Sequence, residues 1–202
     1  MIYLIITTSI NNKHGVINHE HRKKLYIKNI KNTLEMLPAN IKPIIVENNG
    51  YRETYLDNLG CDIIYTDNNN IKTKHKGINE LLDIKYIISK YNINDNDIII
   101  KLTGRYRPLN NKFFDICINN SYDAFLKFYN VCTKKFMKND CVLGFFGIKC
   151  KYLKDFEYDC IKSAEVEFAS FIRNNIDDEK ILSINNLNLE CCFADNLRIL
   201  KV

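Results

Sequence analysis

Apolar residues form alternating short runs and helical stripes along the first half of the chain. Residues 2–8, IYLIITT, are continuously apolar or β-branched, which predicts a strand covered on both faces. From Glu20 to Leu37 apolar residues recur at helical spacing, and Pro38 ends this predicted helix. Strands are then predicted at 42–50, 61–70 and 92–106, and helices at 51–59 and 76–91. This alternation predicts an α/β fold with a mostly parallel, Rossmann-like sheet and helices on both faces.

The pattern changes after Pro108. Two apolar runs, YDAFLKFYN (122–130) and CVLGFFGIK (141–149), read as strands with no long helix between them, which predicts a C-terminal antiparallel extension. A helix is predicted from Ala164 to Arg173, and a last strand at 187–194. Because no repeat or linker interrupts the chain, we predict a single domain over residues 1–202.

Composition narrows the functional classes. The chain has 202 residues, of which 46% are apolar and 26% charged, as expected of a folded globular protein. Its net charge of +5 favours an anionic partner, but no run of Lys and Arg indicates nucleic-acid binding. The first ten residues are too short for a membrane span and lack a signal-peptide pattern, so we expect a cytoplasmic protein without a membrane span. Eight cysteines without a CxxC pair indicate reduced thiols instead of disulfides or a zinc site.

Polar residues gather where each predicted parallel strand ends. Ligands of open parallel sheets bind outside the carboxyl ends of the strands, so these residues are the candidates for a binding pocket. They are TTS (7–9), ENN (47–49), DNNN (67–70) and TGRYR (103–107). Turn formation explains each set alone, but four sets at one sheet edge favour a nucleotide pocket. No GxGxxG or GxxxxGK[ST] motif occurs, which argues against hydride transfer and ATP hydrolysis.

Several segments, in this order, resemble the nucleotide-sugar glycosyltransferases of the GT-A fold, over most of the chain. They are IYLIITTSI, PIIVENNG, NNNIKTKHKGINELLDIKYII, DIIIKLTGRY, and GFFGIK followed by SAEVEF. The chain is most similar to small glycosyltransferase-like proteins of giant DNA viruses and to bacterial polysaccharide enzymes with a GRY strand end; a viral protein would act in the host cytoplasm. The resemblance implies a nucleotide-diphospho-sugar transferase fold, with a nucleotide-sugar-binding half (1–108) and an acceptor-side half (109–202).

The strand 92–106 departs from that family at its end. Where the family carries an acidic D-x-D motif for a divalent cation, this chain has Leu102, Thr103, Gly104 and Arg105. We hypothesise that Arg105, helped by Lys101 or Arg107, neutralises the donor diphosphate in place of the cation, while Gly104 lets the backbone approach the ligand. No metal ligand is therefore predicted. The alternatives are that the arginines pair with surface carboxylates, or that Mn²⁺ or Mg²⁺ is held by other acids such as Asp67 or Asp97.

Other candidates come from the helix starts. Lys76 and Gly77 open a predicted helix whose free N–H groups favour phosphate or sugar, and Arg22 starts the first helix and can reach the same crevice. The resemblance suggests a catalytic base in SAEVEF, with Glu167 preferred over Glu165; residues two apart do not share a helix face. The alternative is that both acids stabilise the amino end of a helix capped by Ser163, with Glu190 and Asp195 as reserves.

Together these features predict transfer of a sugar from a nucleoside diphosphate donor, with UDP the expected nucleotide, to a glycan or glycoprotein acceptor. A non-catalytic nucleotide-sugar-binding module and a nucleotidyltransferase are the alternatives. The oligomeric state is open, with a homodimer as one option. Tyr106 is a candidate for stacking on the sugar or base, against core packing. The residues expected to contact substrate are Thr7, Thr8, Arg22, Glu47, Asn48, Lys76, Gly77, Lys101, Thr103, Gly104, Arg105 and Tyr106.

Overall fold

The computed structural model describes residues 1–11, 19–51, 55–73, 76–193 and 198–202. Its first half contains β1 (Ile2–Thr8), α1 (His19–Glu35), β2 (Ile41–Glu47), β3 (Asp62–Tyr65), α2 (Lys76–Lys90) and β4 (Ile98–Thr103). This order confirms the predicted alternation. The helix predicted at 51–59 is replaced by a 3-10 turn, η1 (Tyr55–Asn58), and residues 52–54 lie outside the described part of the chain. Leu56 is buried while Asp57 and Asn58 are exposed, so this turn lacks the repeated apolar stripe that stabilises a longer helix.

The second half is built from shorter elements. The predicted antiparallel strands are present as β6 (Ala124–Leu126) and β7 (Phe145–Lys149), and the helix predicted from Ala164 to Arg173 is present as α5 (Ala164–Asn175). Their neighbours α3, α4, β5, β8 and β10 were not predicted. A second 3-10 turn, η2 (Asn68–Asn70), lies between β3 and α2. After β4 the elements follow in the order β5 (Arg107–Pro108), α3 (Lys112–Asn119), β6 (Ala124–Leu126), β7 (Phe145–Lys149), α4 (Cys150–Asp155), α5 (Ala164–Asn175), η3 (Asp178–Lys180), β8 (Ile181–Ser183), β9 (Leu189–Cys192) and β10 (Ile199–Lys201).

Seven strands form the central sheet in the order β3-β2-β1-β4-β7-β6-β8. Strands β1 to β4 are mutually parallel where they pair, β7 runs antiparallel to both of its neighbours, and β8 is parallel to β6. The register sets Thr7 beside Thr103 and Thr8 beside Glu47. The polar ends of β1, β2 and β4 therefore meet at one edge of the sheet.

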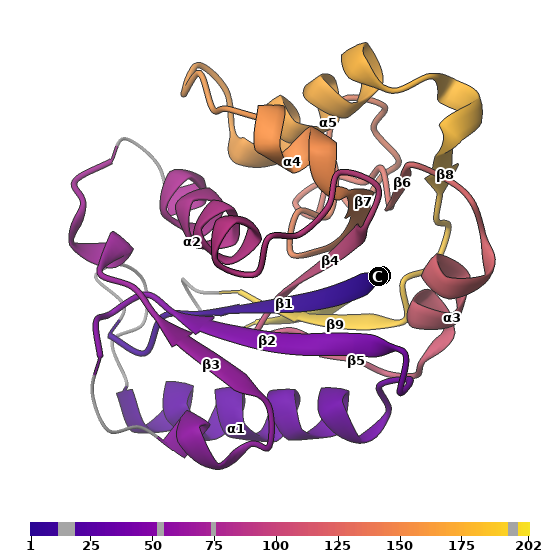
Figure 1. Ribbon diagram of the computed structural model, residues 1–202. Coiled ribbons are helices and arrows are strands. Elements are labelled where there is room, and N and C mark those ends of the chain that lie inside the picture. The colour runs from indigo at the N-terminus through magenta and orange to yellow at the C-terminus, as the bar shows by residue number, and fades with distance from the viewer. Residues whose placement is uncertain (12–18, 52–54, 74–75, 194–197) are drawn as a thin grey trace.

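Helices cover both faces of this sheet, as Figure 1 shows. One core packs α2, α4 and α5 against one face, and a second core packs α1, α3 and a small antiparallel sheet of β10, β9 and β5 against the other. Ile98, Ile99 and Ile100 of β4 are all buried, because the strand has a helix layer on each side. The predicted fold class, including the antiparallel extension, is confirmed.

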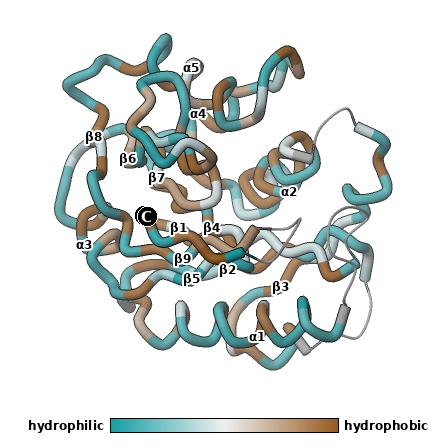
Figure 2. The backbone as a smooth tube through the Cα atoms, turned by 180° about the vertical axis from the view of Figure 1, so that it is seen from behind, coloured by the Kyte–Doolittle hydropathy of each residue, from teal (hydrophilic) through white to brown (hydrophobic). Residues whose placement is uncertain are grey.

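Hydropathy along the backbone follows this layering (Figure 2), with apolar positions concentrated on the central strands. All eight cysteines are free thiols and five of them are buried, in agreement with the expectation of reduced thiols. Within the described residues, none of the helices combines the length and the apolar character that crossing a membrane requires.

Candidate functional site

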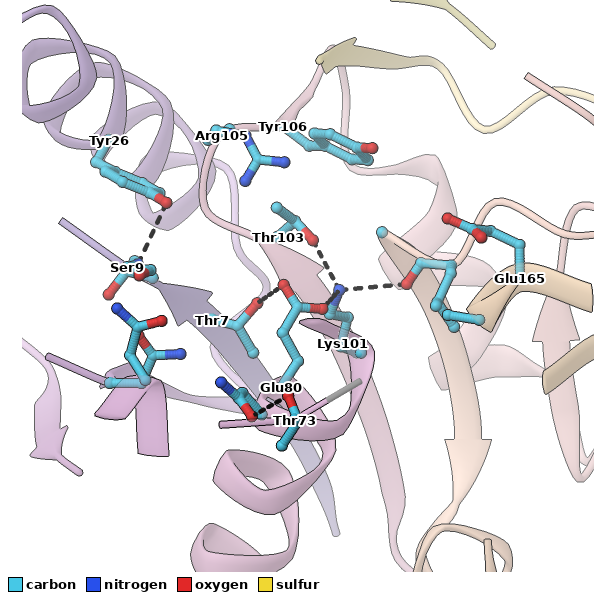
Figure 3. Close-up of a pocket in the computed structure, with 18 of the residues that line it drawn as sticks. Thr7, Ser9, Tyr26, Thr73, Glu80, Lys101, Thr103, Arg105, Tyr106 and Glu165 are labelled. Carbon is cyan, nitrogen blue, oxygen red and sulfur yellow. Dashed lines mark hydrogen bonds and ion pairs between the residues drawn. The ribbon is translucent and has the colours of Figure 1, made fainter. Parts of the chain in front are cut away.

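A pocket of about 800 Å³ opens at the carboxyl ends of β1, β2 and β4. The strands contribute Thr7 and Thr8, Asn48 and Thr103, while α1, α2 and the start of α5 form the walls. Figure 3 shows side chains from these elements converging on the cavity. The pocket lies where an open parallel sheet binds its ligands, because the loops of neighbouring strands meet there.

An ion pair between a buried lysine and a half-buried glutamate lies in the pocket wall. Lys101 is only 2% exposed, and its Nζ donates to Glu80 Oε2 (2.9 Å), Thr103 Oγ1 (2.7 Å) and the Leu143 carbonyl (3.3 Å). Thr7 Oγ1 donates to the other oxygen of Glu80 at 3.4 Å. Burial alone would raise the pKa of Glu80, but the charge and hydrogen bond of Lys101 outweigh burial and lower it. Glu80 is therefore an ionised carboxylate that faces the pocket, and sequence reasoning missed it.

Two guanidinium groups lie beside Tyr26. Arg22 is 5% exposed; its Nε donates to the Ser9 carbonyl (2.9 Å) and its Nη2 to Tyr26 Oη (3.4 Å). Its Nη1 is buried and has no hydrogen-bond partner in the described part of the chain. Arg105 lies beside Tyr26 in Figure 3, and its Nε donates to the Cys192 carbonyl at 3.4 Å.

The charge of these two arginines is not balanced by an ion pair with any residue that the structure describes. Among the described residues, neither Arg22 nor Arg105 forms a salt bridge with a carboxylate. Burial lowers the pKa of Arg105, but Tyr26, Tyr106 and Glu80 raise it on balance, so the guanidinium stays charged. A concave site with two cations and an unsatisfied N–H is suited to an anion.

A second polar cluster lies on the α2 side of the pocket. The Asp83 carboxylate is fully buried and accepts hydrogen bonds from Thr66 Oγ1 (2.6 Å), Asn68 Nδ2 (2.7 Å) and Asn48 Nδ2 (3.0 Å). Burial raises the pKa of Asp83 to about 6, although the three hydrogen bonds act in the opposite direction. Asn48 Oδ1 is buried without a partner within the described ranges. The sequence indicated Asn48 but gave no sign of Asp83.

The two candidate acids of α5 have different surroundings. Glu165 lines the pocket, and Figure 3 shows it on the side of Lys101 that is away from Tyr26 and Ser9. The Glu167 carboxylate instead accepts hydrogen bonds from the backbone N–H groups of Cys160 (3.2 Å), Ile161 (2.7 Å) and Lys162 (2.8 Å), and it does not line the pocket. Ser163 caps the helix by accepting a hydrogen bond from the Val166 N–H at 3.4 Å.

Three of the other predicted substrate contacts also line the cavity, namely Gly77, Thr103 and Tyr106. Glu47 does not, because its buried carboxylate accepts hydrogen bonds from Thr8 Oγ1 (2.9 Å) and the Ile10 N–H (3.1 Å) inside the protein. The position of a Cβ on Gly104 would lie 2.8 Å from the Tyr26 ring and 2.9 Å from Thr8, so its missing side chain makes room for protein and not for a ligand.

Several remaining candidates lie elsewhere or cannot be placed. Arg107 forms an ion pair with Glu190 between β5 and β9, with Nε and Nη2 at 2.9 and 2.6 Å from the same oxygen, outside the pocket. Lys76 begins α2, but its side chain is outside the described part of the chain, as is Asp195. Asp67 is exposed and does not line the pocket.

The end of β4 does not fit a divalent cation. Such ions require several oxygen ligands, usually with more than one carboxylate. Here Lys101 and Arg105 are cationic, and the adjacent carboxylate of Glu80 already pairs with Lys101. Asp97 lies at the opposite end of β4, where it pairs with the N-terminal ammonium group. Within the described ranges, no three His, Cys, Asp or Glu side chains gather as a metal site.

No protein-family profile and no curated protein sequence matches the chain. Solved structures do resemble it. A protein from Aquifex aeolicus VF5 has a TM-score of 0.54 at 11% identity, over 91% of this chain and 85% of that one. A protein from Desulfovibrio desulfuricans G20, named provisionally as a nucleotide-diphospho-sugar transferase, has a TM-score of 0.53 at 10% identity, over 91% and 79%. A 4-diphosphocytidyl-2C-methyl-D-erythritol synthase has a TM-score of 0.51 at 8% identity, over 93% and 90%.

Identities this low show a shared fold and not a shared reaction. The chain therefore has the α/β fold found in nucleotide-diphospho-sugar transferases, with a polar pocket at the carboxyl ends of the parallel strands.

Proposed function

We propose that this protein transfers a sugar from a nucleoside diphosphate donor to a hydroxyl group of a glycan or glycoprotein acceptor. The observation that carries the proposal is the buried Arg22 guanidinium, which lines the pocket with an N–H that has no partner among the described residues. Arg105 adds a second cation on the same side of the cavity. Two adjacent guanidiniums match the charge and the acceptor oxygens of a diphosphate.

The arginines would act most strongly on the leaving group. In the proposed reaction the acceptor oxygen attacks the anomeric carbon, and the bond from this carbon to the diphosphate oxygen breaks. The electron pair stays on the diphosphate, whose growing negative charge Arg22 and Arg105 stabilise. Because these cations are held in place by Tyr26, Ser9 and the Cys192 carbonyl, they need little rearrangement during the reaction. No metal ion is required in this scheme.

Glu165 would take the proton of the acceptor hydroxyl. It lines the pocket, whereas Glu167 is occupied by three backbone N–H groups. A single displacement with one base inverts the anomeric configuration. The ionised Glu80 carboxylate would accept hydrogen bonds from hydroxyl groups of the donor sugar, since its side chain remains 32% exposed.

Two other functions would use the same pocket but give different products. A nucleotidyltransferase would join a nucleoside triphosphate to a phosphate acceptor and release pyrophosphate. A non-catalytic module would bind nucleotide sugars and release nothing. Measuring nucleoside diphosphate and pyrophosphate release from a panel of nucleotide sugars and nucleoside triphosphates separates the three.

The decisive experiment compares Arg105→Ala with Arg107→Ala. Arg107 is the matched control, because it lies two residues away but pairs with Glu190 outside the pocket. We expect Arg105→Ala to lower kcat/KM for nucleotide-sugar turnover by about 100- to 1000-fold, as the loss of one fixed charge-stabilising donor does. Arg107→Ala should stay within about threefold of the wild type, and EDTA should have no effect. Turnover that needs Mn²⁺ or Mg²⁺ and survives Arg105→Ala would refute the proposal.

A further inference from the structure

The side-chain amide of Asn48 has only one of its two polar ends committed. Its Nδ2 donates to Asp83 at 3.0 Å, and the side chain is 5% exposed at the pocket. An ionised carboxylate only accepts hydrogen bonds, so the NH₂ group and not the carbonyl of Asn48 must face Asp83. Thr66 and Asn68 also donate to Asp83, which fixes the position of its carboxylate. Asp83 therefore determines which way the Asn48 amide is turned.

The other end of that amide is an unused acceptor. Asn48 Oδ1 is buried and accepts no hydrogen bond from any residue that the structure describes. A buried acceptor without a donor costs about 1–3 kcal/mol, which a ligand N–H in the pocket would recover. The amide offers a ligand its carbonyl alone, because its NH₂ group is already used.

The strand order sets this acceptor apart from the two arginines. Asn48 follows β2 and Arg105 follows β4, with β1 between them. Neighbouring strands are about 4.8 Å apart, so the ends of β2 and β4 are about 10 Å apart. A nucleotide whose diphosphate lies at Arg22 and Arg105 would extend its ribose over Thr7 and Thr8 and bring its base to Asn48.

We infer that Asp83 is a positioning residue that sets the base preference of the pocket by presenting the Asn48 carbonyl to ring atom N3 of a pyrimidine. The inference rests on the proposed binding of a nucleoside diphosphate. Uracil carries a hydrogen on N3 and can donate to Asn48 Oδ1, whereas N3 of cytosine is an acceptor and meets another acceptor. The preference for uracil is thus imposed by a residue that does not itself line the pocket.

The wild-type protein gives the first test, by calorimetric titration with UDP, CDP and N3-methyl-UDP. We expect CDP and N3-methyl-UDP to bind about 10- to 100-fold more weakly than UDP, the factor that corresponds to one unmet buried acceptor. Equal affinity for UDP and N3-methyl-UDP overturns the inference, whatever a variant shows.

Asp83→Asn tests the positioning role directly. An amide at 83 can donate to Asn48 as well as accept from it, so Asn48 can turn over and present its NH₂ group to the base. We expect the UDP-to-CDP affinity ratio to fall at least tenfold. Thr66→Val is the matched control, because it removes one hydrogen bond to Asp83 but leaves the Asn48 contact, and its ratio should equal that of the wild type. A variant that weakens UDP and CDP equally indicates a purely structural role and overturns the inference.

The anion site is tested separately by Arg22→Ala. This change should weaken UDP and CDP by the same factor, because both carry the diphosphate that Arg22 is proposed to bind. If Arg22→Ala binds UDP and CDP as tightly as the wild type does, the proposed function fails. A base preference governed by Asp83 would still be supported by the UDP-to-CDP affinity ratio.

Discussion

The ion pair between Lys101 and Glu80 allows a direct test of how the pocket wall is stabilised. Replacing Lys101 by Met keeps most of the side-chain volume but removes an ammonium group that is 2% exposed and makes three hydrogen bonds. Removing one partner of a buried ion pair costs about 3–5 kcal/mol. Because the Glu80 side chain keeps 32% exposure, water can solvate the carboxylate left behind. We therefore expect Lys101→Met to lower the free energy of unfolding by about 2–3 kcal/mol.

The opposite change should cost more. Glu80→Gln leaves the Lys101 ammonium buried without its counter-charge, with Thr103 Oγ1, the Leu143 carbonyl and the new amide oxygen as acceptors. We expect a loss of about 3–5 kcal/mol. The double variant has no uncompensated charge, so its cost should be smaller than the sum of the two single costs. The resulting coupling energy should be about 2–3 kcal/mol.

Urea denaturation followed by circular dichroism at pH 7 measures all three variants. For a chain of this size, each kcal/mol should also lower Tm by about 2–4 °C. Lys85→Met is the matched control, because Lys85 pairs with Glu157, whose side chain is 78% exposed, and exposed pairs contribute less than about 1 kcal/mol. If the costs of Lys101→Met and Glu80→Gln simply add in the double variant, the pair is not coupled and the reasoning is refuted.

Three further predictions concern the pocket and the residues around it. A Cβ on Gly144 would lie 2.0 Å from the Tyr106 ring, so Gly144→Ala should force the ring to move and cost about 1–3 kcal/mol in urea denaturation; an unchanged midpoint would contradict this packing. Glu165→Gln should lower kcat by about 100-fold or more and leave Tm unchanged. Glu167→Gln should lower Tm and leave kcat unchanged, because it removes an acceptor of backbone N–H groups. The reverse pattern would make Glu167 the base. The raised pKa of Asp83 means that the folded state binds this proton more tightly than the unfolded state, so the contribution of Asp83 to stability grows as pH falls through about 6. Between pH 7 and pH 5 the free energy of unfolding of the wild type should rise by about 1 kcal/mol relative to that of Asp83→Asn. Parallel pH profiles of the two proteins would contradict the burial of a charged Asp83.

The first half of the chain could be predicted because its strands are continuous apolar runs. Strands such as β1 and β4 are buried on both faces, so their sequences show no polar interruption until the sheet edge. The later elements lack such a signal. Strand β8 has three residues, and the eight-residue helix α3 carries adjacent Phe113 and Phe114, which do not distinguish a short helix from a strand. The insertion of β7 between β4 and β6 depends on long-range pairing that no local pattern encodes.

The pocket could be predicted only in part, for a related reason. Parallel strands bring their carboxyl ends together, so the strand-end rule found Thr7, Asn48 and Thr103. It also selected Glu47, because it does not say whether a side chain faces the ligand or the protein. Glu80 and Asp83 lie inside an apolar helix, where sequence reasoning attended to the apolar stripe. The available signal was Lys101, since a lysine in a buried strand requires a carboxylate partner.

Charge balance explains why the end of β4 carries arginine in place of an acidic pair. The described residues that line the pocket include four cationic side chains, Arg22, Lys72, Lys101 and Arg105, but only two carboxylates, Glu80 and Glu165. Glu80 neutralises Lys101, and neither guanidinium at Tyr26 forms an ion pair with a described carboxylate. Aspartates at the end of β4 would pair with these arginines and occupy the N–H groups that an anion needs. A metal-binding acidic pair and a pair of arginines without carboxylate partners among the described residues are thus competing solutions for one strand end, and this chain has the second.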